Sequence, residues 1–280
     1  MCYVITSHMV KIKRLIKEAF IEVARNGWTP ESVARLAGMF RNEALLYAFP
    51  SRPEQVVKPY LDSLFKKEIE SRRFLKHHKG IGSFTVDRLM PDYRAMLDSM
   101  NRASIDLIKL ERPNSIDVST ARFSSWLMNI PPGQQVIPEF YDLPAVQAIT
   151  KPIDAQLNYE HSRRAIDQGH KLLTNINMVT ALQGGAFAGI WHAHAKTPSY
   201  DARPEHWARN EKIYIMRDGW AHKEGLVKKT NGMWLEEIPD PPSVPVNCTC
   251  FWEFEYQLEG IADKYPEALT QKGRDYISVE

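Results

Sequence analysis

The sequence predicts an α+β protein, in which a long helical N-terminal region is followed by a small C-terminal α+β domain with short antiparallel strands. Apolar residues in the first third return to one face with the 3.6-residue period of an α-helix. The last third holds short strand-like segments separated by turn residues. Prolines cluster between the two patterns, so four segments are expected. They are a helical arm or bundle over 1–112, a proline-rich connecting segment over 113–157, an α+β domain over 158–258 and a tail over 259–280.

Length and composition are typical of a globular protein. The chain has 280 residues, of which 44% are hydrophobic and 25% charged, enough to bury a core without disulfide or metal support. No apolar run approaches the about 20 residues that a membrane-spanning helix needs, and the N-terminus is a poor secretion signal. The three cysteines do not form a disulfide framework, so we expect a reducing compartment.

Glycine, proline and capping residues predict the helix boundaries of the N-terminal region. A first helix is expected over 9–24, ended by Gly27, and a second begins with Thr29 as N-cap and Pro30 in its first turn. Three longer helices are expected over 54–78, 85–111 and 158–189. Several amphipathic helices in series indicate a bundle or an elongated arm.

The C-terminal third predicts short strands. Their expected ranges are 212–216, 219–221, 233–236 and 250–256. A small-residue patch over 184–189 precedes them, and small residues there let another segment pack close.

Basic residues are concentrated in the N-terminal part. Residues 1–113 hold 20 Lys and Arg against 13 Asp and Glu, which leaves 16 against 21 for the rest of the chain's 36 and 34. Six basic residues cluster at the end of the 54–78 helix: Lys66, Lys67, Arg72, Arg73, Lys76 and Lys79. They could contact double-stranded DNA through its phosphates, which needs no sequence code. An ordinary solvated helix face is the alternative.

Asp201, Arg203 and His206 form one candidate cluster. Asp201 and Arg203 share a side of an extended segment, where the carboxylate can hold the guanidinium. His206 follows at a spacing that a turn can fold back onto either residue. We expect a hydrogen-bonded clasp rather than catalysis, because neither a nucleophile nor a paired general acid is apparent nearby.

Cys248 and Cys250 form a second candidate cluster. Residues two apart in an extended segment point the same way, so both thiols could face one metal ion. His206, or His192 and His194, could complete a tetrahedral zinc site. Two buried free thiols are the alternative, because cysteine behaves as a small hydrophobic residue, and a disulfide between them would be strained.

The order of these residues resembles the Mu F-like family of tailed-phage minor head proteins, also called head morphogenesis proteins. That family shows a tryptophan strand, a D-x-R-x-x-H core, a glycine-bearing loop and a proline-led N-C-x-C. The matching positions here are Trp191, Asp201, Arg203, His206, Gly219 or Gly225, Asn247, Cys248 and Cys250. The resemblance covers 162–255, including a helix before the tryptophan, and departs from the family at Thr249, where Arg is usual.

The resemblance implies a minor structural protein of the phage head, not an enzyme, that acts in head morphogenesis near the portal vertex. It would assemble in the host cytoplasm and reside in the virion. Its partners would be portal protein or major capsid protein, with phosphate contacts to packaged DNA and no membrane. The N-terminal helices would dock on portal or capsid. Four tryptophans are candidate interface anchors or core residues: Trp207, Trp220, Trp234 and Trp252.

Two alternatives come from other functional classes. A zinc-dependent hydrolase or nuclease would use His192, His194, His206 and the cysteines, with Asp201 or Glu205 as the acid or base. A DNA-binding module would instead centre on the basic N-terminal helices and bind without the C-terminal domain.

Overall fold

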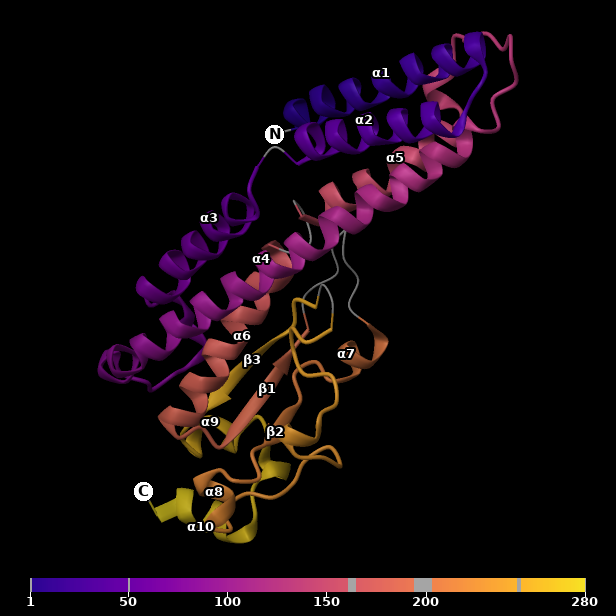
Figure 1. Cartoon of the computed structure of the whole chain (residues 1–280). Coiled ribbons are helices and arrows are strands. Elements are labelled where there is room, and N and C mark those ends of the chain that lie inside the picture. Colours follow the sequence, from indigo (N-terminus) through magenta and orange to yellow (C-terminus); the bar gives the residue numbers. More distant parts are fainter. Residues whose placement is uncertain (1, 50, 161–164, 194–202, 246–247, 280) are drawn as a thin grey trace. The chain divides into compact units, whose positions relative to one another are not determined.

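The structure is a computed structural model that describes residues 2–49, 51–160, 165–193, 203–245 and 248–279. The chain divides into two compact units. Met1–Lys58 and Arg102–Arg164 form what we call the helical unit, and Pro59–Asn101 and Ala165–Glu280 form the sheet unit. The predicted fold class is confirmed: a mostly helical N-terminal region precedes a C-terminal region with a small antiparallel sheet and short helices (Figure 1). None of the described helices combines the length and apolarity needed to cross a membrane.

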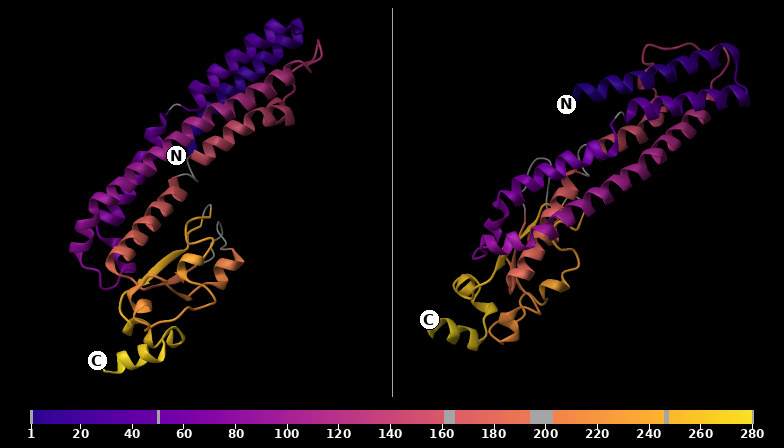
Figure 2. Two further views of the ribbon diagram at one scale, coloured as in Figure 1. Left: turned by 60° about the horizontal axis from the view of Figure 1, so that its bottom comes forward. Right: turned by 60° about the vertical axis from the view of Figure 1, so that its left-hand side comes forward.

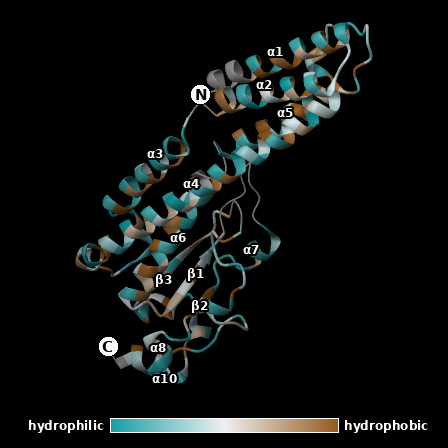
Figure 3. Cartoon of the chain, in the orientation of Figure 1, coloured by the Kyte–Doolittle hydropathy of each residue, from teal (hydrophilic) through white to brown (hydrophobic). Residues whose placement is uncertain are grey.

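The helical unit contains α1 (Cys2–Asn26), α2 (Pro30–Ala48), the second part of α4 (Ser83–Leu127), η3 (Phe140–Asp142) and α5 (Pro144–Asn158). α1 and α2 lie side by side and run in opposite directions in every view (Figure 1, Figure 2). Hydrophilic and hydrophobic residues alternate along both helices (Figure 3), and many of the apolar ones are buried in the core, although Val10 and Leu46 are exposed. Aromatic rings fill that core, and the largest buried ones are Phe20, Phe40, Phe123 and Phe140.

The predicted start of the second helix is confirmed. Thr29 Oγ1 accepts a hydrogen bond from the Ser32 amide at 3.1 Å, and Ser32 Oγ accepts one from the Thr29 amide at 2.9 Å. This reciprocal capping box satisfies two amides at the beginning of α2. Gly27 follows α1 with a φ of +71°, a left-handed conformation that glycine adopts without a steric cost.

The structure differs from the expected connecting segment over 113–157. α4 continues through Pro113 to Leu127, and α5 occupies most of the remainder. Ile116, Phe123 and Leu127 are completely buried at helical spacing. Burial of these three large apolar side chains stabilises the fold by about 1.5–3 kcal/mol each. Their sum exceeds the cost of about 3 kcal/mol for a proline inside a helix.

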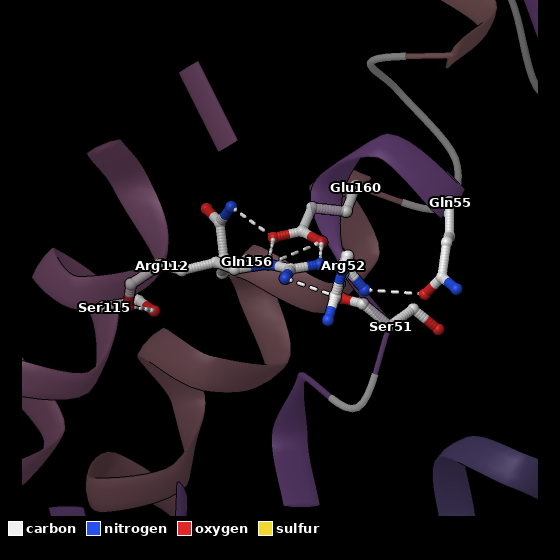
Figure 4. Close-up of polar contacts among 7 residues, drawn as sticks. All are labelled: Ser51, Arg52, Gln55, Arg112, Ser115, Gln156 and Glu160. Atoms are coloured by element: carbon white, nitrogen blue, oxygen red, sulfur yellow. Dashed lines mark hydrogen bonds and ion pairs between the residues drawn. The ribbon is translucent and has the colours of Figure 1, made fainter. Parts of the chain in front are cut away.

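A buried ion pair in the helical unit joins α4 to Glu160, two residues after the end of α5 (Figure 4). The Arg112 guanidinium donates to Glu160 through Nε at 2.9 Å and through Nη2 at 2.7 Å, and Gln156 Nε2 donates to the same carboxylate at 2.8 Å. Arg112 Nη1 also donates to the backbone carbonyl of Ser51 at 2.8 Å. The Glu160 side chain is 2% exposed, so the carboxylate depends on these partners for its solvation.

The sheet unit contains the rest of the regular structure. Its elements are most of α3 (Pro53–Phe65), η1 (Lys66–Glu70), η2 (Arg73–His77), the first part of α4, α6 (Ala165–Gly184), β1 (Ala188–His192), α7 (Pro204–Ala208), β2 (Ile213–Ile215), α8 (Trp220–Lys223), η5 (Leu235–Glu237), β3 (Phe251–Glu255), α9 (Glu259–Ala262), η6 (Pro266–Ala268) and α10 (Gln271–Val279).

The sheet has the order β2-β1-β3 and both pairings are antiparallel. In the central strand, Ala188 is opposite Ile215 on one side and Glu255 on the other. Successive residues alternate between two apolar clusters. Trp191, Trp252 and the two cysteines belong to one cluster, and Ile190 with residues from the C-terminal helices belongs to the other.

The C-terminal segment over 259–280 is part of the sheet unit rather than a separate tail. Ile261, Tyr265 and Leu269 are buried against the cluster that contains Ile190. The segment therefore covers one face of the sheet. Its apolar residues lie in short helical turns, and their contribution to a core depends on tertiary contacts that the sequence pattern does not express.

Two of the four predicted strands are confirmed. β2 and β3 lie within 212–216 and 250–256. The expectation for 219–221 is wrong, because α8 begins there, and 233–236 contains one isolated bridge of Met233 followed by the 3₁₀ turn η5. The central strand β1 begins within the last two residues of the helix expected over 158–189, because Gly185, with a φ of +79°, ends α6 earlier. The tryptophan strand implied by the resemblance corresponds to β1, which contains Trp191.

The predicted close packing at the small-residue patch is confirmed at Gly189. A Cβ atom there would lie 2.9 Å from the Leu235 side chain and 3.1 Å from the Trp252 ring. Glycine therefore lets these two large side chains cover the central strand.

Candidate metal centre

His206, Cys248 and Cys250 come together in the sheet unit. His206 lies on the short helix α7, and the two cysteines lie in the segment that leads into β3. His206 Nδ1 is 3.5 Å from Cys248 Sγ and 3.4 Å from Cys250 Sγ. The histidine is 0% exposed and each cysteine 1%. Three ligand-type atoms thus converge on one enclosed point, and this group could hold a metal ion such as zinc.

The spacing of the three atoms matches tetrahedral zinc coordination. Zinc bonds of about 2.3 Å to sulfur and about 2.0 Å to nitrogen at a tetrahedral angle place the two ligand atoms about 3.5 Å apart. Both nitrogen–sulfur distances agree with that value. The imidazole ring and the thiols therefore need little movement to bind the ion.

The electrostatics of the site favour a thiolate. A hydrogen bond with the Cys250 thiol lowers the pKa of Cys248 to about 5, despite the opposing effect of burial, and the backbone amides of Ser243 and Cys250 add to the lowering. Thiolates, not thiols, are the metal-binding form of cysteine. The backbone is thus arranged to stabilise the charge that a metal ligand needs.

A carboxylate orients the histidine from its other side. His206 Nε2 lies 3.0 Å from Asp240 Oδ2, and Arg209 Nη1 donates to Asp240 Oδ1 at 2.6 Å. Burial raises the pKa of Asp240, but the hydrogen bonds from Arg209 and His206 outweigh it and the net pKa is lowered. With its proton on Nε2, His206 donates to Asp240 and presents the lone pair of Nδ1 to the cysteines. A carboxylate behind a metal-binding histidine is the usual outer partner.

Aromatic rings enclose the centre. The Trp191 ring meets the His206 ring edge-on at 5.1 Å and the Trp252 ring at 5.2 Å, and the Arg209 guanidinium lies 5.2 Å from the centre of the Trp191 ring. The indole nitrogens of both tryptophans are buried without a hydrogen-bond partner among the described residues. Such a shell keeps water away and strengthens the electrostatic interactions inside it.

The structure brings together four of the residues singled out in the sequence: Trp191, His206, Cys248 and Cys250. Arg203 immediately precedes α7, where its backbone carbonyl accepts hydrogen bonds from the His206 amide at 2.9 Å and from the Trp207 amide at 3.0 Å. The positions of three further predicted residues, His194, Asp201 and Asn247, lie outside the described residues. The expected hydrogen-bonded clasp of Asp201, Arg203 and His206 is therefore still a prediction.

His192 does not belong to this cluster. Strand alternation directs it away from the face of β1 that carries Trp191. Its Nε2 atom lies 3.0 Å from Glu253 Oε2, and its ring stacks on Phe251 with a centroid distance of 5.0 Å. His192 therefore lies outside the group of His206, Cys248 and Cys250, because the strand holds it against a carboxylate of β3. The option that pairs it with His194 stays a prediction, since His194 lies outside the described residues.

The four tryptophans considered as anchors differ in exposure. Trp252 is 2% exposed and belongs to the core, and Trp220 and Trp234 pack against the other apolar cluster. Trp207, on α7 beside the metal centre, is 40% exposed.

The basic residues expected on one helix end are divided among different backbone conformations. α3 ends at Phe65, Lys66 and Lys67 lie in the π-helical turn η1, and Arg72 has a left-handed φ of +65° before η2 begins with Arg73. Three of the six lie beside carboxylates. Arg72 pairs with Asp87, Lys79 Nζ lies 2.7 Å from Glu253 Oε1, and Lys67 Nζ lies 3.9 Å from Glu68 Oε1. A single basic face over 66–79 therefore does not form.

Sequence reasoning missed Asp240 and Arg209. Asp240 follows Pro239 in a proline-rich stretch that looks like a plain loop, and its role depends on contact with a helix 31 residues away. Glu205, the acid or base proposed for an enzyme, lies close enough to His206 and Asp240 to form a second potential cation group. Arg209 already occupies one oxygen of Asp240, which disfavours a second cation there.

Comparisons of the chain with protein-family models, with curated proteins and with solved structures find no significant match. The resemblance to Mu F-like proteins therefore rests on the motif residues and their spacing. What the structure adds is the convergence of four of those residues on one buried centre.

Proposed function

We propose that the chain is a minor structural protein of a tailed-phage head, acting in head morphogenesis near the portal vertex, and that zinc bound by His206, Cys248 and Cys250 stabilises its sheet unit. The observation that carries the proposal is the single buried cluster of Trp191 with these three residues. These four residues are distant in the sequence and adjacent in one core, as expected of residues that share a structural role.

Burial supports a structural role over a catalytic one. Structural zinc sites are closed by four protein ligands, whereas a catalytic zinc has three protein ligands and one position open to water and substrate. The described residues supply three ligands, so burial is the argument for a structural role: they are at most 1% exposed, and the Trp191 ring packs against His206. A zinc hydrolase would use the same three ligands, but it also needs access for a substrate, which this burial disfavours. The DNA-binding alternative is weakened because Arg72 and Lys79 are already paired with carboxylates.

The head function is tested by quantitative mass spectrometry of purified heads and virions from the phage or induced prophage that encodes the chain. We expect the protein at a low, fixed ratio to portal protein and far below major capsid protein. Cross-linking should then join it to portal or to capsid protein. Absence of the protein from both heads and virions would contradict a structural role.

Metal binding is tested separately by elemental analysis of the full chain, purified without added zinc and dialysed against a weak chelator. We expect about one zinc ion per chain in the wild type, and little in Cys248→Ser or His206→Asn. Cys2→Ser is the matched control, because it removes the remaining cysteine and should leave the zinc content unchanged. A metal-free wild-type protein with both buried thiols intact would refute the zinc site and leave the head function open to its own test.

A further inference from the structure

A cavity of about 370 Å³ lies in the sheet unit beside the metal centre, and Cys250 is one of its lining residues. Its walls come from irregular backbone as well as from α6: the π-helical turn η1 supplies Glu68, and the 3₁₀ turn η2 supplies Lys76. A third wall contains Ser243, which is 3% exposed and has a left-handed φ of +66°. π-turns and strained non-glycine residues concentrate at functional sites. Two such features therefore line the same cavity.

Hydrogen-bond donors on the walls are not committed to protein partners. The Thr249 hydroxyl is buried and has no hydrogen-bond partner among the described residues. Lys76 forms no ion pair within the described part of the chain. The one carboxylate among the lining residues, Glu68, lies 3.9 Å from Lys67. The cavity thus offers a hydroxyl and an ammonium group without a matching acceptor.

Hydrogen bonds from Tyr256 through His78 orient the side-chain amide of Asn177, which is a third donor. Tyr256 Oη donates to His78 Nδ1 at 2.6 Å, and His78 Nε2 donates to Asn177 Oδ1 at 3.1 Å. Burial lowers the pKa of His78 to about 4 and raises that of Tyr256, so at neutral pH the histidine is uncharged and the tyrosine keeps its proton. Because its oxygen is committed to His78, Asn177 has its NH₂ group left to donate into the cavity that it lines.

We propose that this cavity binds a small organic oxyanion, a molecule with a carboxylate or phosphate head and a short apolar body. The head would accept hydrogen bonds from Thr249 and Asn177 and lie near Lys76, and the body would contact Leu64 and Phe74. At about 30 Å³ for each water-sized group, the volume admits about a dozen non-hydrogen atoms. The inference depends neither on the metal nor on the head function.

The test is isothermal titration calorimetry of the full chain at pH 7 with three probes of similar shape. Phenylacetate and phenyl phosphate carry the two head groups, and benzyl alcohol is the uncharged analogue. We expect at least one acid to bind and the alcohol not to bind. Thr249→Val and Lys76→Met should each weaken binding of that acid by about tenfold, since each removes a polar contact to a charged group.

Two matched variants separate the cavity from general effects. Ser119→Ala removes another buried hydroxyl that has no hydrogen-bond partner among the described residues, and Lys66→Met removes a lysine of η1 that does not line the cavity. Both should bind the acid as the wild type does. Thr249→Val should unfold at the same temperature as the wild type or higher, because the lost hydroxyl has no protein partner. Zinc content is measured alongside, since Thr249 lies between the two cysteines. The proposal is overturned if neither acid binds, or if Thr249→Val binds it unchanged.

Discussion

The buried histidine of the sheet unit predicts a specific loss of stability in acid. His78 is 1% exposed and lies between the Tyr256 hydroxyl and the Asn177 amide, with its ring stacked on Phe254. Burial lowers its pKa from 6.5 to about 4. Between these values the unfolded chain binds a proton that the folded chain does not, so the free energy of unfolding falls as the pH falls.

The size of the effect follows from the two pKa values. One pKa unit corresponds to about 1.4 kcal/mol, so the His78 contribution to stability declines by about 2 kcal/mol between pH 7 and pH 5 and by about 3 kcal/mol by pH 4. This is a large part of the 5–15 kcal/mol that typically separates folded from unfolded states. We therefore expect the sheet unit to lose structure in mild acid.

Urea unfolding at pH 7 and pH 5, followed by tryptophan fluorescence, measures the effect. Residues 59–101 and 165–280 contain five of the seven tryptophans, so the signal reports mainly on the sheet unit. His78→Gln should be less stable at pH 7 but lose about 2 kcal/mol less than the wild type on going to pH 5. Tyr93→Phe, which removes a hydrogen bond to Thr180 and keeps His78, should retain the wild-type pH dependence. Parallel pH profiles for the wild type and His78→Gln would refute the reasoning.

Three further predictions concern the other buried contacts. Asp240→Ala should weaken zinc binding by about 10–100-fold in a chelator competition, because it removes the partner that orients His206. Glu205→Ala, which removes a nearby carboxylate with no described bond to that ring, should change zinc binding little. Equal losses in the two variants would argue for a general effect of charge. Glu160→Gln should destabilise the helical unit by about 3–5 kcal/mol in urea, because Arg112 would keep a buried charge without its counterion; a loss below about 1 kcal/mol would contradict this. Gly273→Ala should lower the melting temperature of the sheet unit, because its Cβ would overlap a backbone carbonyl, and an unchanged melting curve would show that the chain moves freely there.

Local signals explain which parts of the fold were predictable. The capping box and the left-handed glycine around α2 act within a few residues, so the sequence contains all the information that they need. β1 could not be found in the same way. Its first four residues are all buried, so the strand has no alternation of apolar and polar residues to distinguish it from the end of a helix. Pro113 is a local stop signal that was overridden by the burial of Ile116 and Phe123.

The sequence could predict only those residues of the candidate site whose side-chain type is itself typical of metal ligands. Cysteine and histidine are rare in the chain, at 3 and 9 residues, and their ligand chemistry singles them out. Asp240 and Arg209 are two of 70 charged residues, obtained from 36 basic and 34 acidic ones, and only the folded structure distinguishes them. His192 shows the limit of residue type, because the strand directs this histidine to Glu253 and not to the two cysteines.

The shape of the sheet explains why a metal would matter in this unit. Its three strands have five, three and five residues, and so small a sheet gains limited stability from its own ladder. The metal ligands are 42 and 44 residues apart, and the ion would join α7 to the segment before β3. A cross-link over that distance removes conformational freedom mainly from the unfolded chain, as a disulfide does. Because the three ligand residues are at most 1% exposed, stabilisation of the fold accounts for the centre without a substrate.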